Sequence, residues 1–265
     1  MKEEVRDNHS EKILSYFYNS LNRDKNIFET MASTIIGFDE NGKLDNSYVK
    51  LIINTKYRSC LRTTNEGHRK TYDKLYENID KLYQKNDLPF CNYNKNNTSS
   101  KDILERLIEL PSNYQKHYEF CHIWGYSRNP WLNNAYWNTY FIPYYWAYLT
   151  DKNKGGDFGN DFSKYLKKTI ISNKFVKEKI IQYNRDFYSY FTENQNIKIL
   201  EEYMKEPESY GNNSKVNMNY ILEQLVLINI NDGIEKRLFN FDDNNLLVIN
   251  PDIKDNLNEY GVNDL

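Results

Sequence analysis

The spacing of apolar residues changes in the middle of this chain, and that change limits the folds that it can adopt. From about residue 156 to 191 the large apolar side chains recur every three or four residues, which is the period of an amphipathic helix. Between residues 117 and 151 the pattern is dense in aromatic residues and partly alternating, which favours short strands. We therefore expect an α+β fold, mainly helical, with a small β-containing insert near its middle.

Shorter patterns predict the remaining elements. We expect helices near residues 10–21, 68–85, 100–110, 197–205 and 216–228, a turn at 38–42, and a short strand at 244–250. The segment YVKLIIN at 48–54 fits a strand or a buried helix, because its apolar period does not decide between them. Residues 251–254 carry acid and lysine side chains after an apolar run, and we interpret them as a loop.

Composition excludes several classes of protein. The chain has 265 residues, of which 39% are hydrophobic and 27% charged, so it can bury a sizeable core and is not a disordered chain. Its three cysteines are widely spaced and include no CxxC pair, which disfavours a disulfide scaffold and a four-cysteine zinc site. There is no apolar run of membrane-spanning length and no signal-peptide pattern, so we expect no membrane association and a cytoplasmic location.

The formal net charge is −2, but the positive charge is unevenly distributed. The stretch from residue 56 to 70 holds five basic residues against one acid, Glu66, and the stretch from 161 to 185 holds seven against two. A nucleic-acid-binding protein needs only a local positive surface, so the overall charge does not exclude DNA. Each stretch taken alone also fits a solvated helix face. The candidates for phosphate or guanine contacts are Lys56, Arg58, Arg62, Arg69, Lys70 and Arg128.

The most informative segment is Glu119 to Asp151, EFCHIWGYSRNPWLNNAYWNTYFIPYYWAYLTD. His122 ends a strand-like stretch, and a turn-rich stretch follows it. Asn138 then begins an apolar run to Pro143, and a helix-compatible stretch closes at Asp151. The expected order is therefore strand, loop, strand and helix.

That order, with the Cys-His-Ile-Trp start and Asn138 five residues before Pro143, resembles one branch of the HNH or His-Me finger nucleases. The resemblance covers the middle eighth of the chain. It implies a ββα-metal finger in which His122 is the general base and Asn138 is the structural asparagine that fixes the loop and orients the histidine. A histidine satisfied inside an aromatic core is the alternative interpretation of His122.

Two positions depart from the family pattern. Many members have an aspartate just before the histidine, where this chain has Cys121, and a histidine or asparagine where it has Trp146 and Ala147. A hard cation such as Mg²⁺ prefers oxygen ligands. Asp151 is the nearest carboxylate on the expected helix, and Glu119 and Asn134 are other oxygen donors within reach along the chain. We therefore expect Asp151 and Glu119 to bind Mg²⁺ or Mn²⁺.

The chemistry fits these roles, because imidazole can deprotonate water near neutral pH and a divalent cation can polarise the scissile phosphate. We expect a sequence-selective endonuclease for double-stranded DNA, of the restriction type, and a homodimer where the target is palindromic. A nonspecific defence nuclease or toxin is one alternative. A non-catalytic nucleic-acid-binding or protein-interaction module is the other.

The expected division of the chain has three parts. Residues 1–110 form an N-terminal helical region with a DNA-binding role, and residues 111–160 form the finger. Residues 161–265 form a C-terminal helical region with a short terminal strand.

Overall fold

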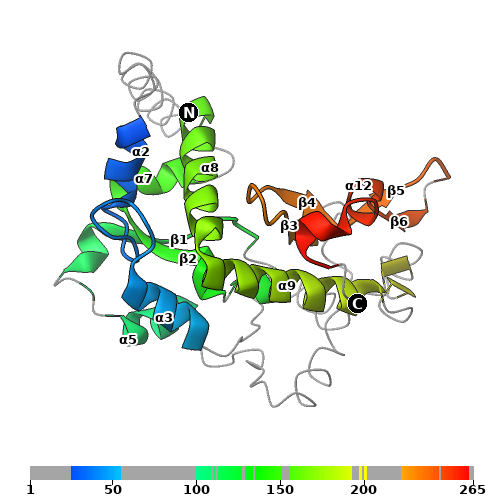
Figure 1. Ribbon diagram of the computed structural model, residues 1–265, viewed down its shortest axis with the longest axis horizontal. Coiled ribbons are helices and arrows are strands. Elements are labelled where there is room, and N and C mark those ends of the chain that lie inside the picture. Colours follow the sequence, from blue (N-terminus) through cyan, green and yellow to red (C-terminus); the bar gives the residue numbers. More distant parts are fainter. Residues whose placement is uncertain are drawn as a thin grey trace, which may run out of the picture. The chain divides into compact units, whose positions relative to one another are not determined.

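The computed structural model separates the chain into two compact units, each assembled from several segments (Figure 1). The first unit comprises Met1–Thr55, Thr98–Gly125 and Tyr136–Val176, and the second comprises Lys56–Asn97, Tyr126–Ala135 and Lys177–Leu265. The residues that the structure describes are 25–54, 100–108, 110, 113–126, 129–133, 135–150, 156–192, 197–198, 200–201, 222–244 and 246–262. The helices expected near residues 10–21 and 68–85 lie outside these residues.

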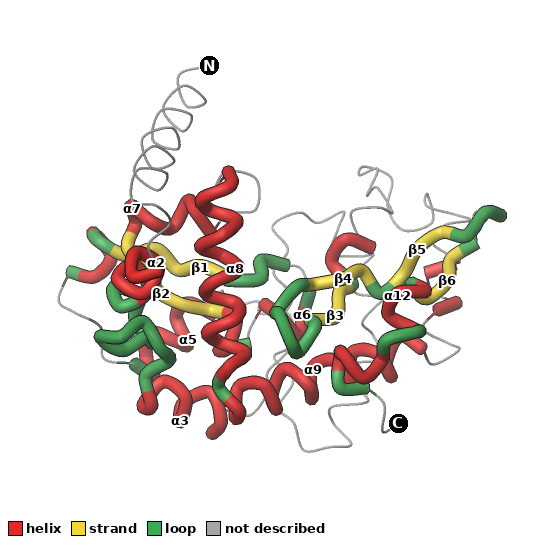
Figure 2. Tube along the Cα trace, turned by 45° about the horizontal axis from the view of Figure 1, so that its top comes forward, coloured by secondary structure: helices red, strands yellow, loops and turns green. Residues whose placement is uncertain are grey.

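The expected α+β class is confirmed, since helices are combined with short antiparallel strand pairs (Figure 2). The central pair of the first unit consists of β1 (Tyr118–His122) and β2 (Thr139–Pro143), with Phe120 opposite Phe141. On the other side of β2, the backbone N–H of Ile36 donates to the carbonyl of Phe141 at 3.0 Å. The strand β2 is therefore covered on both edges, and all five of its residues are buried.

Short helices surround this strand pair, and one long helix packs beside it. The long helix is α8 (Gly156–Ser172), and its neighbour η3 comes so close that a Cβ on Gly159 would lie 2.9 Å from the carbonyl oxygen of Leu149. The shorter elements are α2 (Lys25–Ala32), α3 (Asn46–Asn54), α5 (Ser100–Leu107), η1 (Tyr114–Lys116), η2 (Tyr136–Asn138), α7 (Tyr144–Ala147) and η3 (Tyr148–Thr150).

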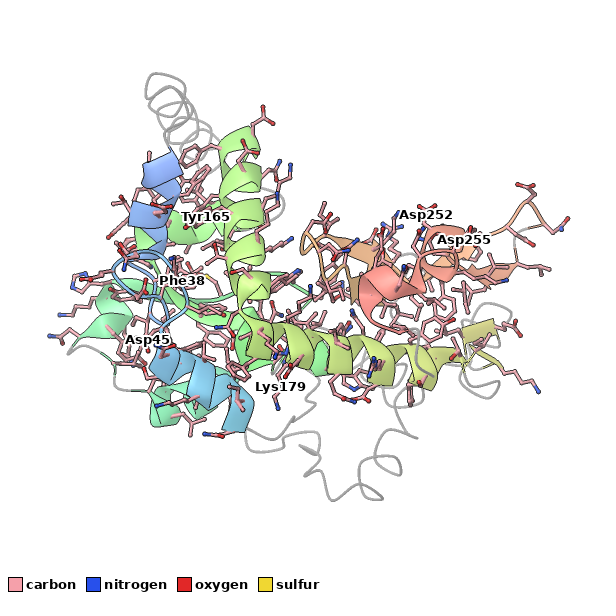
Figure 3. All side chains as sticks on the ribbon, in the orientation of Figure 1. Phe38, Asp45, Tyr165, Lys179, Asp252 and Asp255 are labelled. Carbon is pink, nitrogen blue, oxygen red and sulfur yellow. The ribbon has the colours of Figure 1, made fainter. Side chains whose placement is uncertain are left out.

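The helix α8 turns one apolar stripe inward, as its sequence period predicts. Phe158, Phe162, Leu166 and Ile170 are all buried. The ring of Phe28 on α2 lies 5.5 Å from that of Phe158 and 5.8 Å from that of Phe162. Figure 3 shows Tyr165 on the side of α8 that faces α2, where its ring also lies 5.8 Å from Phe28. These contacts fix the rotation of α8 about its own axis.

The segment YVKLIIN forms the helix α3, which settles the choice that its period leaves open. The reason lies just outside the apolar run. The carboxylate Oδ1 of Asp45 accepts from the backbone N–H of Ser47 at 2.7 Å and of Tyr48 at 3.2 Å, so it caps the helix start. Tyr48, Val49 and Ile52 then face the core from one side of the helix.

The second unit contains the other two strand pairs and the greater part of the helix α9 (Lys174–Thr192). Its buried side chains include the stripe that the sequence predicts on α9, namely Ile180, Tyr183, Phe187 and Phe191. The remaining elements are α6 (Pro130–Asn133), β3 (Val226–Ile228), β4 (Glu235–Arg237), β5 (Phe239–Phe241), β6 (Leu247–Ile249), α12 (Pro251–Lys254) and η5 (Leu257–Tyr260).

Two expectations about the C-terminal region are wrong. The helix expected over 216–228 does not include Val226–Ile228, which form β3 and pair with β4, because Gly233 at φ 78° lets the chain reverse between them. Residues 251–254 form α12 rather than a loop, since Asn250 Oδ1 accepts from the N–H of Asp252 at 3.1 Å and Pro251 suits a first helical turn. The strand expected at 244–250 is present as β6.

The division into units differs from the linear division that the sequence suggests. Residues 126–135, which connect β1 to β2, belong to the second unit together with most of α9 and the C-terminal strands. The physical reason is Trp131, whose ring packs edge-on against Phe187 at 5.0 Å and near Tyr190 at 5.3 Å.

No helix in the described part of the chain is both long enough and apolar enough to cross a membrane.

Buried tyrosines predict that this fold loses stability in alkali. Burial raises the pKa of Tyr48, Tyr140 and Tyr183 above the ordinary value of 10.0, and it raises the pKa of Tyr260 to about 12. Above pH ~10 the unfolded chain releases these phenolic protons while the folded chain keeps them. Stability should therefore be retained below pH ~10 and fall above it by about 1.4 kcal/mol per pH unit for each such phenol.

Urea unfolding measured from neutral pH upward, with tyrosinate absorbance recorded in parallel, checks this. The expected result is that part of the tyrosinate signal appears only together with unfolding. Complete titration of all tyrosines near pH ~10 in a protein that is still folded would contradict it.

Candidate active site

His122 is the last residue of β1 and lies opposite Thr139 of β2. It is partly exposed, so it is not sealed inside the aromatic core. Its ring packs edge-on against Phe120, with centroids 5.3 Å apart and planes at 83°. Because side chains two residues apart in a strand share one face, Phe120 supports the imidazole from below. The strand thus presents a histidine at its end with one side of the ring held by an apolar neighbour.

Asn138 holds the loop that begins immediately after His122. It is fully buried, and its side-chain oxygen Oδ1 accepts from the backbone N–H of Trp124 at 2.8 Å. Its side-chain amide Nδ2 donates to the carbonyl of Gly125 at 3.3 Å, and its own carbonyl accepts from the N–H of Ile123 at 2.9 Å. One buried residue therefore forms hydrogen bonds with backbone groups of the three consecutive residues that follow the histidine.

The backbone reverses direction at this point. Gly125 adopts a φ of 71°, and its N–H donates to the carbonyl of His122 at 3.1 Å. Tyr126 follows with a φ of 57°, which is uncommon for a residue that carries a Cβ. Such a turn can persist only where its surroundings impose it, and the hydrogen bonds of Asn138 provide part of that constraint.

Aromatic side chains form the floor beneath the loop. The indoles of Trp124 and Trp137 meet edge to face at 5.5 Å, and both are buried. They therefore pack inside the first unit and are not available to stack on a nucleic-acid base.

A residue that sequence reasoning missed fixes the first residue of β2. The hydroxyl of Tyr48 donates to the carbonyl of Thr139 at 2.6 Å, and its ring stacks on Tyr140 at 5.2 Å. Burial raises the pKa of Tyr48, so the hydroxyl stays protonated and remains a donor. Thr139 is the cross-strand partner of His122, so α3 helps to position the histidine through this contact. No local pattern could reveal a contact between residues so far apart in the chain.

The predicted ligand Glu119 does not lie on the histidine's face. It is exposed, and it precedes His122 by three positions in the same strand, so the pleat directs the two side chains to opposite faces. Cys121 shares the face of Glu119, where it lies opposite Tyr140 of β2. The strand therefore does not bring Glu119 and His122 together.

The described residues contain no group of three histidine, cysteine or carboxylate side chains that could hold a metal ion. The other predicted ligand, Asp151, lies outside the described residues, one position after the end of η3. Trp146 stands where the resemblance to nuclease fingers would lead one to expect a metal ligand. Its indole Nε1 is buried and has no hydrogen-bond partner among the described residues. The predicted nucleic-acid contacts also lie outside the described residues: Lys56, Arg58, Arg62, Arg69, Lys70 and Arg128.

A second histidine marks the other end of β1. His117 is exposed, and its carbonyl accepts from the N–H of Tyr144 at 2.9 Å, which closes the strand pair where α7 begins. His117 thus lies immediately before β1, and His122 is the last residue of that strand. This arrangement makes His117 a natural internal control for the role of His122.

Comparison with known proteins gives one family. A family model described as uncharacterised protein PM1201 matches residues 38–230, which include β1, β2 and the whole of α9. No curated protein and no solved structure matches the chain.

Replacement of Asn138 by alanine should destabilise the first unit. The N–H of Trp124 and the carbonyl of Gly125 would lose their buried partner, at a cost of about 2–3 kcal/mol. Urea unfolding measures the loss, and amide hydrogen exchange should show faster exchange at Trp124. The matched control is Asn160→Ala, at an exposed position on α8, which should change stability little. Equal stability of the two variants would remove Asn138 from the role described here.

Proposed function

We propose that this chain, which belongs to the family described as uncharacterised protein PM1201, is a metal-dependent DNA endonuclease with His122 as its general base. The observation that carries the proposal is the position of His122. The histidine ends the first strand of an antiparallel pair, is partly exposed, and precedes a loop that Asn138 holds through buried hydrogen bonds. The nuclease fingers that the sequence resembles have the same arrangement of histidine and asparagine.

The proton chemistry follows from the imidazole. Hydrolysis of a phosphodiester requires deprotonation of the attacking water, and a neutral imidazole nitrogen can accept that proton near neutral pH. The ring of Phe120 and the fixed loop at Trp124 restrict the movement of His122, so little rotamer freedom is lost when substrate binds. In this proposal Asn138 is a positioning residue, since its hydrogen bonds reach the loop backbone.

A divalent cation, Mg²⁺ or Mn²⁺, would supply positive charge to the scissile phosphate. The described residues do not by themselves provide its ligands, and Glu119 projects from the wrong face of β1 to join His122. The proposal therefore assigns the oxygen ligand to Asp151, which follows β2 through α7 and η3. Because Glu119 projects from the face of β1 opposite His122, it is not part of the proposed metal site.

Double-stranded DNA is the proposed substrate, and the basic stretch from residue 56 to 70 together with Arg128 is proposed to contact it. Sequence selection and a homodimeric state for a palindromic target belong to the same proposal. A nonspecific nuclease would share His122 but would produce a smear rather than discrete bands from plasmid DNA.

A second function, a nucleic-acid-binding module without catalysis, is favoured by one observation. Cys121 and Trp146 occupy positions where nuclease fingers have ligands for a hard cation, and neither side chain offers an oxygen. Binding without cleavage, in the presence of Mg²⁺ or Mn²⁺, would select this alternative.

The decisive variant is His122→Ala. Loss of the general base should lower the rate of plasmid cleavage about a hundredfold or more while leaving the fold intact. The control is His117→Ala, which removes an exposed imidazole immediately before the same strand and should leave the rate unchanged. Cleavage of supercoiled plasmid in Mg²⁺ and in Mn²⁺ measures both. If the two variants cut as fast as the unmodified protein, His122 has no part in the reaction.

Removal of the cation should abolish cleavage. Chelation with EDTA is expected to stop the reaction, and added Mg²⁺ or Mn²⁺ should restore it. Asp151→Asn should lower the rate about a hundredfold, the order of effect seen when one transition-state-stabilising group is lost. Glu119→Gln should have no effect, since Glu119 lies on the other face of β1. The opposite ranking of these two variants would reverse the ligand assignment.

A further inference from the structure

Lysines are concentrated in the second half of α8 and at the start of α9. Between Asp161 and Glu178 every charged residue is a lysine, and there are five of them: Lys164, Lys167, Lys168, Lys174 and Lys177. Four of these five lie in the first unit, the same unit as His122. This density of positive charge is unusual in a chain whose formal net charge is −2.

The fold exposes three of these lysines, Lys164, Lys168 and Lys174, to solvent. The apolar stripe of α8 is buried, with Phe162, Leu166 and Ile170 all at 0% exposure. The opposite face exposes Lys164 and Lys168, one helical turn apart, and then Ser172 at the helix end. One turn of helix spaces the two lysines by about 6 Å along the axis. The rotation of α8, fixed by its contacts with α2, therefore sets the direction of the charge.

The start of α9 adds an exposed aromatic ring to the charge. Lys174 is exposed, and the ring-bearing residue Phe175 has 53% of its surface exposed. The carboxamide Oδ1 of Asn173 accepts from the N–H of Phe175 at 3.1 Å and of Val176 at 3.3 Å. This cap fixes the first turn of α9, so Phe175 is presented on a rigid element. Figure 1 shows the end of α8 leading directly into α9. We call Lys164, Lys168, Lys174 and Phe175 the junction surface.

Within the described residues, the positive charge of the junction surface is not paired with a carboxylate. No carboxylate among the described residues forms an ion pair with Lys164, Lys168 or Lys174. The acids of α8, Asp157 and Asp161, lie in its first half. Glu29 and Asp39 approach the helix at Tyr165, on the side that packs against α2. Within the part of the chain that the structure describes, the three exposed lysines are therefore available to a polyanion.

We propose that the junction surface binds single-stranded nucleic acid, with the three lysines on consecutive phosphates and the ring of Phe175 stacked on a base. Lysines spaced by one helical turn suit a chain of phosphates, and an exposed aromatic ring gives any base a stacking partner. A membrane surface fits less well, because an interfacial helix needs an exposed apolar face and that face of α8 is buried in the core. This binding site does not depend on the proposed cleavage by His122.

Stacking on Phe175 requires a base that is not paired and stacked within a duplex. The surface should therefore prefer a single strand over a duplex of equal length. For a DNA-cutting enzyme, such a site would hold a displaced or frayed strand beside the duplex that is cut.

The test is a fluorescence-anisotropy titration of a fluorescein-labelled oligothymidylate of about twenty nucleotides, in EDTA, over a range of salt concentrations. Simultaneous Lys164→Gln, Lys168→Gln and Lys174→Gln should weaken binding at least tenfold at low salt. The slope of log binding constant against log salt concentration should also become shallower by about 0.7 for each phosphate contact that is lost. Replacement of the same lysines by arginine should preserve binding, which separates loss of charge from loss of fold.

Phe175→Ala should weaken binding about tenfold without changing the salt dependence, because stacking releases no counterions. The controls lie elsewhere in the first unit and should bind like the unmodified protein. They are Lys43→Gln with Lys50→Gln, at exposed positions, and Tyr144→Ala, whose ring is 60% exposed.

Several results would overturn the proposal. One is unchanged oligothymidylate binding in both the lysine and the Phe175 variants. The others are tighter binding of a duplex than of a single strand of the same length, and binding of polyglutamate as tight as that of oligothymidylate. Binding of phosphatidylserine vesicles without binding of the oligonucleotide would assign the surface to a membrane instead. Since EDTA excludes cleavage, a loss of binding in the lysine variants stands even if His122→Ala leaves activity unchanged. Conversely, unchanged binding in the lysine variants together with loss of cleavage in His122→Ala would contradict the proposed binding surface and leave the proposed nuclease function standing.

Discussion

The candidate site depends on the buried carboxamide of Asn138. A loop that leaves the end of a two-stranded pair has no sheet to continue, so its backbone groups need partners from elsewhere. Asn138 supplies an acceptor for Trp124, a donor for Gly125 and a carbonyl for Ile123, all from a position with no solvent exposure. A water molecule could replace any one of these bonds but could not hold three residues in register. One residue therefore contributes three of the hydrogen bonds that set the direction in which the chain leaves His122.

Other buried asparagines among the described residues of the second unit use the same kind of hydrogen bonding. Asn129 is fully buried, accepts from the N–H groups of Trp131 and Leu132, and donates to the carbonyl of Gln224 at 2.9 Å. Asn184 is also fully buried, and it both accepts from and donates to the backbone of Ile228, with a further bond to the carbonyl of Tyr260. Each asparagine joins backbone segments that have no common sheet or helix. In a chain with many short elements, this is how loops are buried without orphaned amides.

The sequence predicts some parts of the fold and not others, because hydrogen bonds from a buried asparagine to distant backbone groups leave no local pattern. The helices α8 and α9 follow from their apolar stripes, and β1 follows from its alternation, since these signals are local and repeated. The strands β4 and β5 are three residues long and partly exposed, so they carry too few residues for a period to appear. The local sequence does not distinguish an asparagine that is buried and bonds to loop backbone from one that lies in an exposed turn.

The alternation before His122 correctly predicts that this histidine ends a strand, but it does not predict which residues lie around it. The bond from Tyr48 to the carbonyl of Thr139 joins residues that are distant in the chain, and only tertiary packing brings them together. The positions of Glu119 and Cys121 relative to His122 depend on the pleat of β1. That relation could have been derived once the strand was assumed, since residues three apart in a strand face opposite ways.

The pleat of β1 narrows the chemistry that the site could perform. One face carries Phe120 and His122, and the other carries Glu119 and Cys121, so the carboxylate and the imidazole of this strand cannot act on the same atom. The opposing strand β2 offers no carboxylate, because it reads Thr-Tyr-Phe-Ile-Pro and is buried throughout. Since residues 123–138 contain no Asp or Glu, a carboxylate ligand from this hairpin region would come from the chain after β2. The first carboxylate there is Asp151, reached through α7 and η3. For the proposed nuclease, Asp151 is thus the single carboxylate of this region that could serve beside His122, which makes its substitution the sharpest test of the ligand assignment.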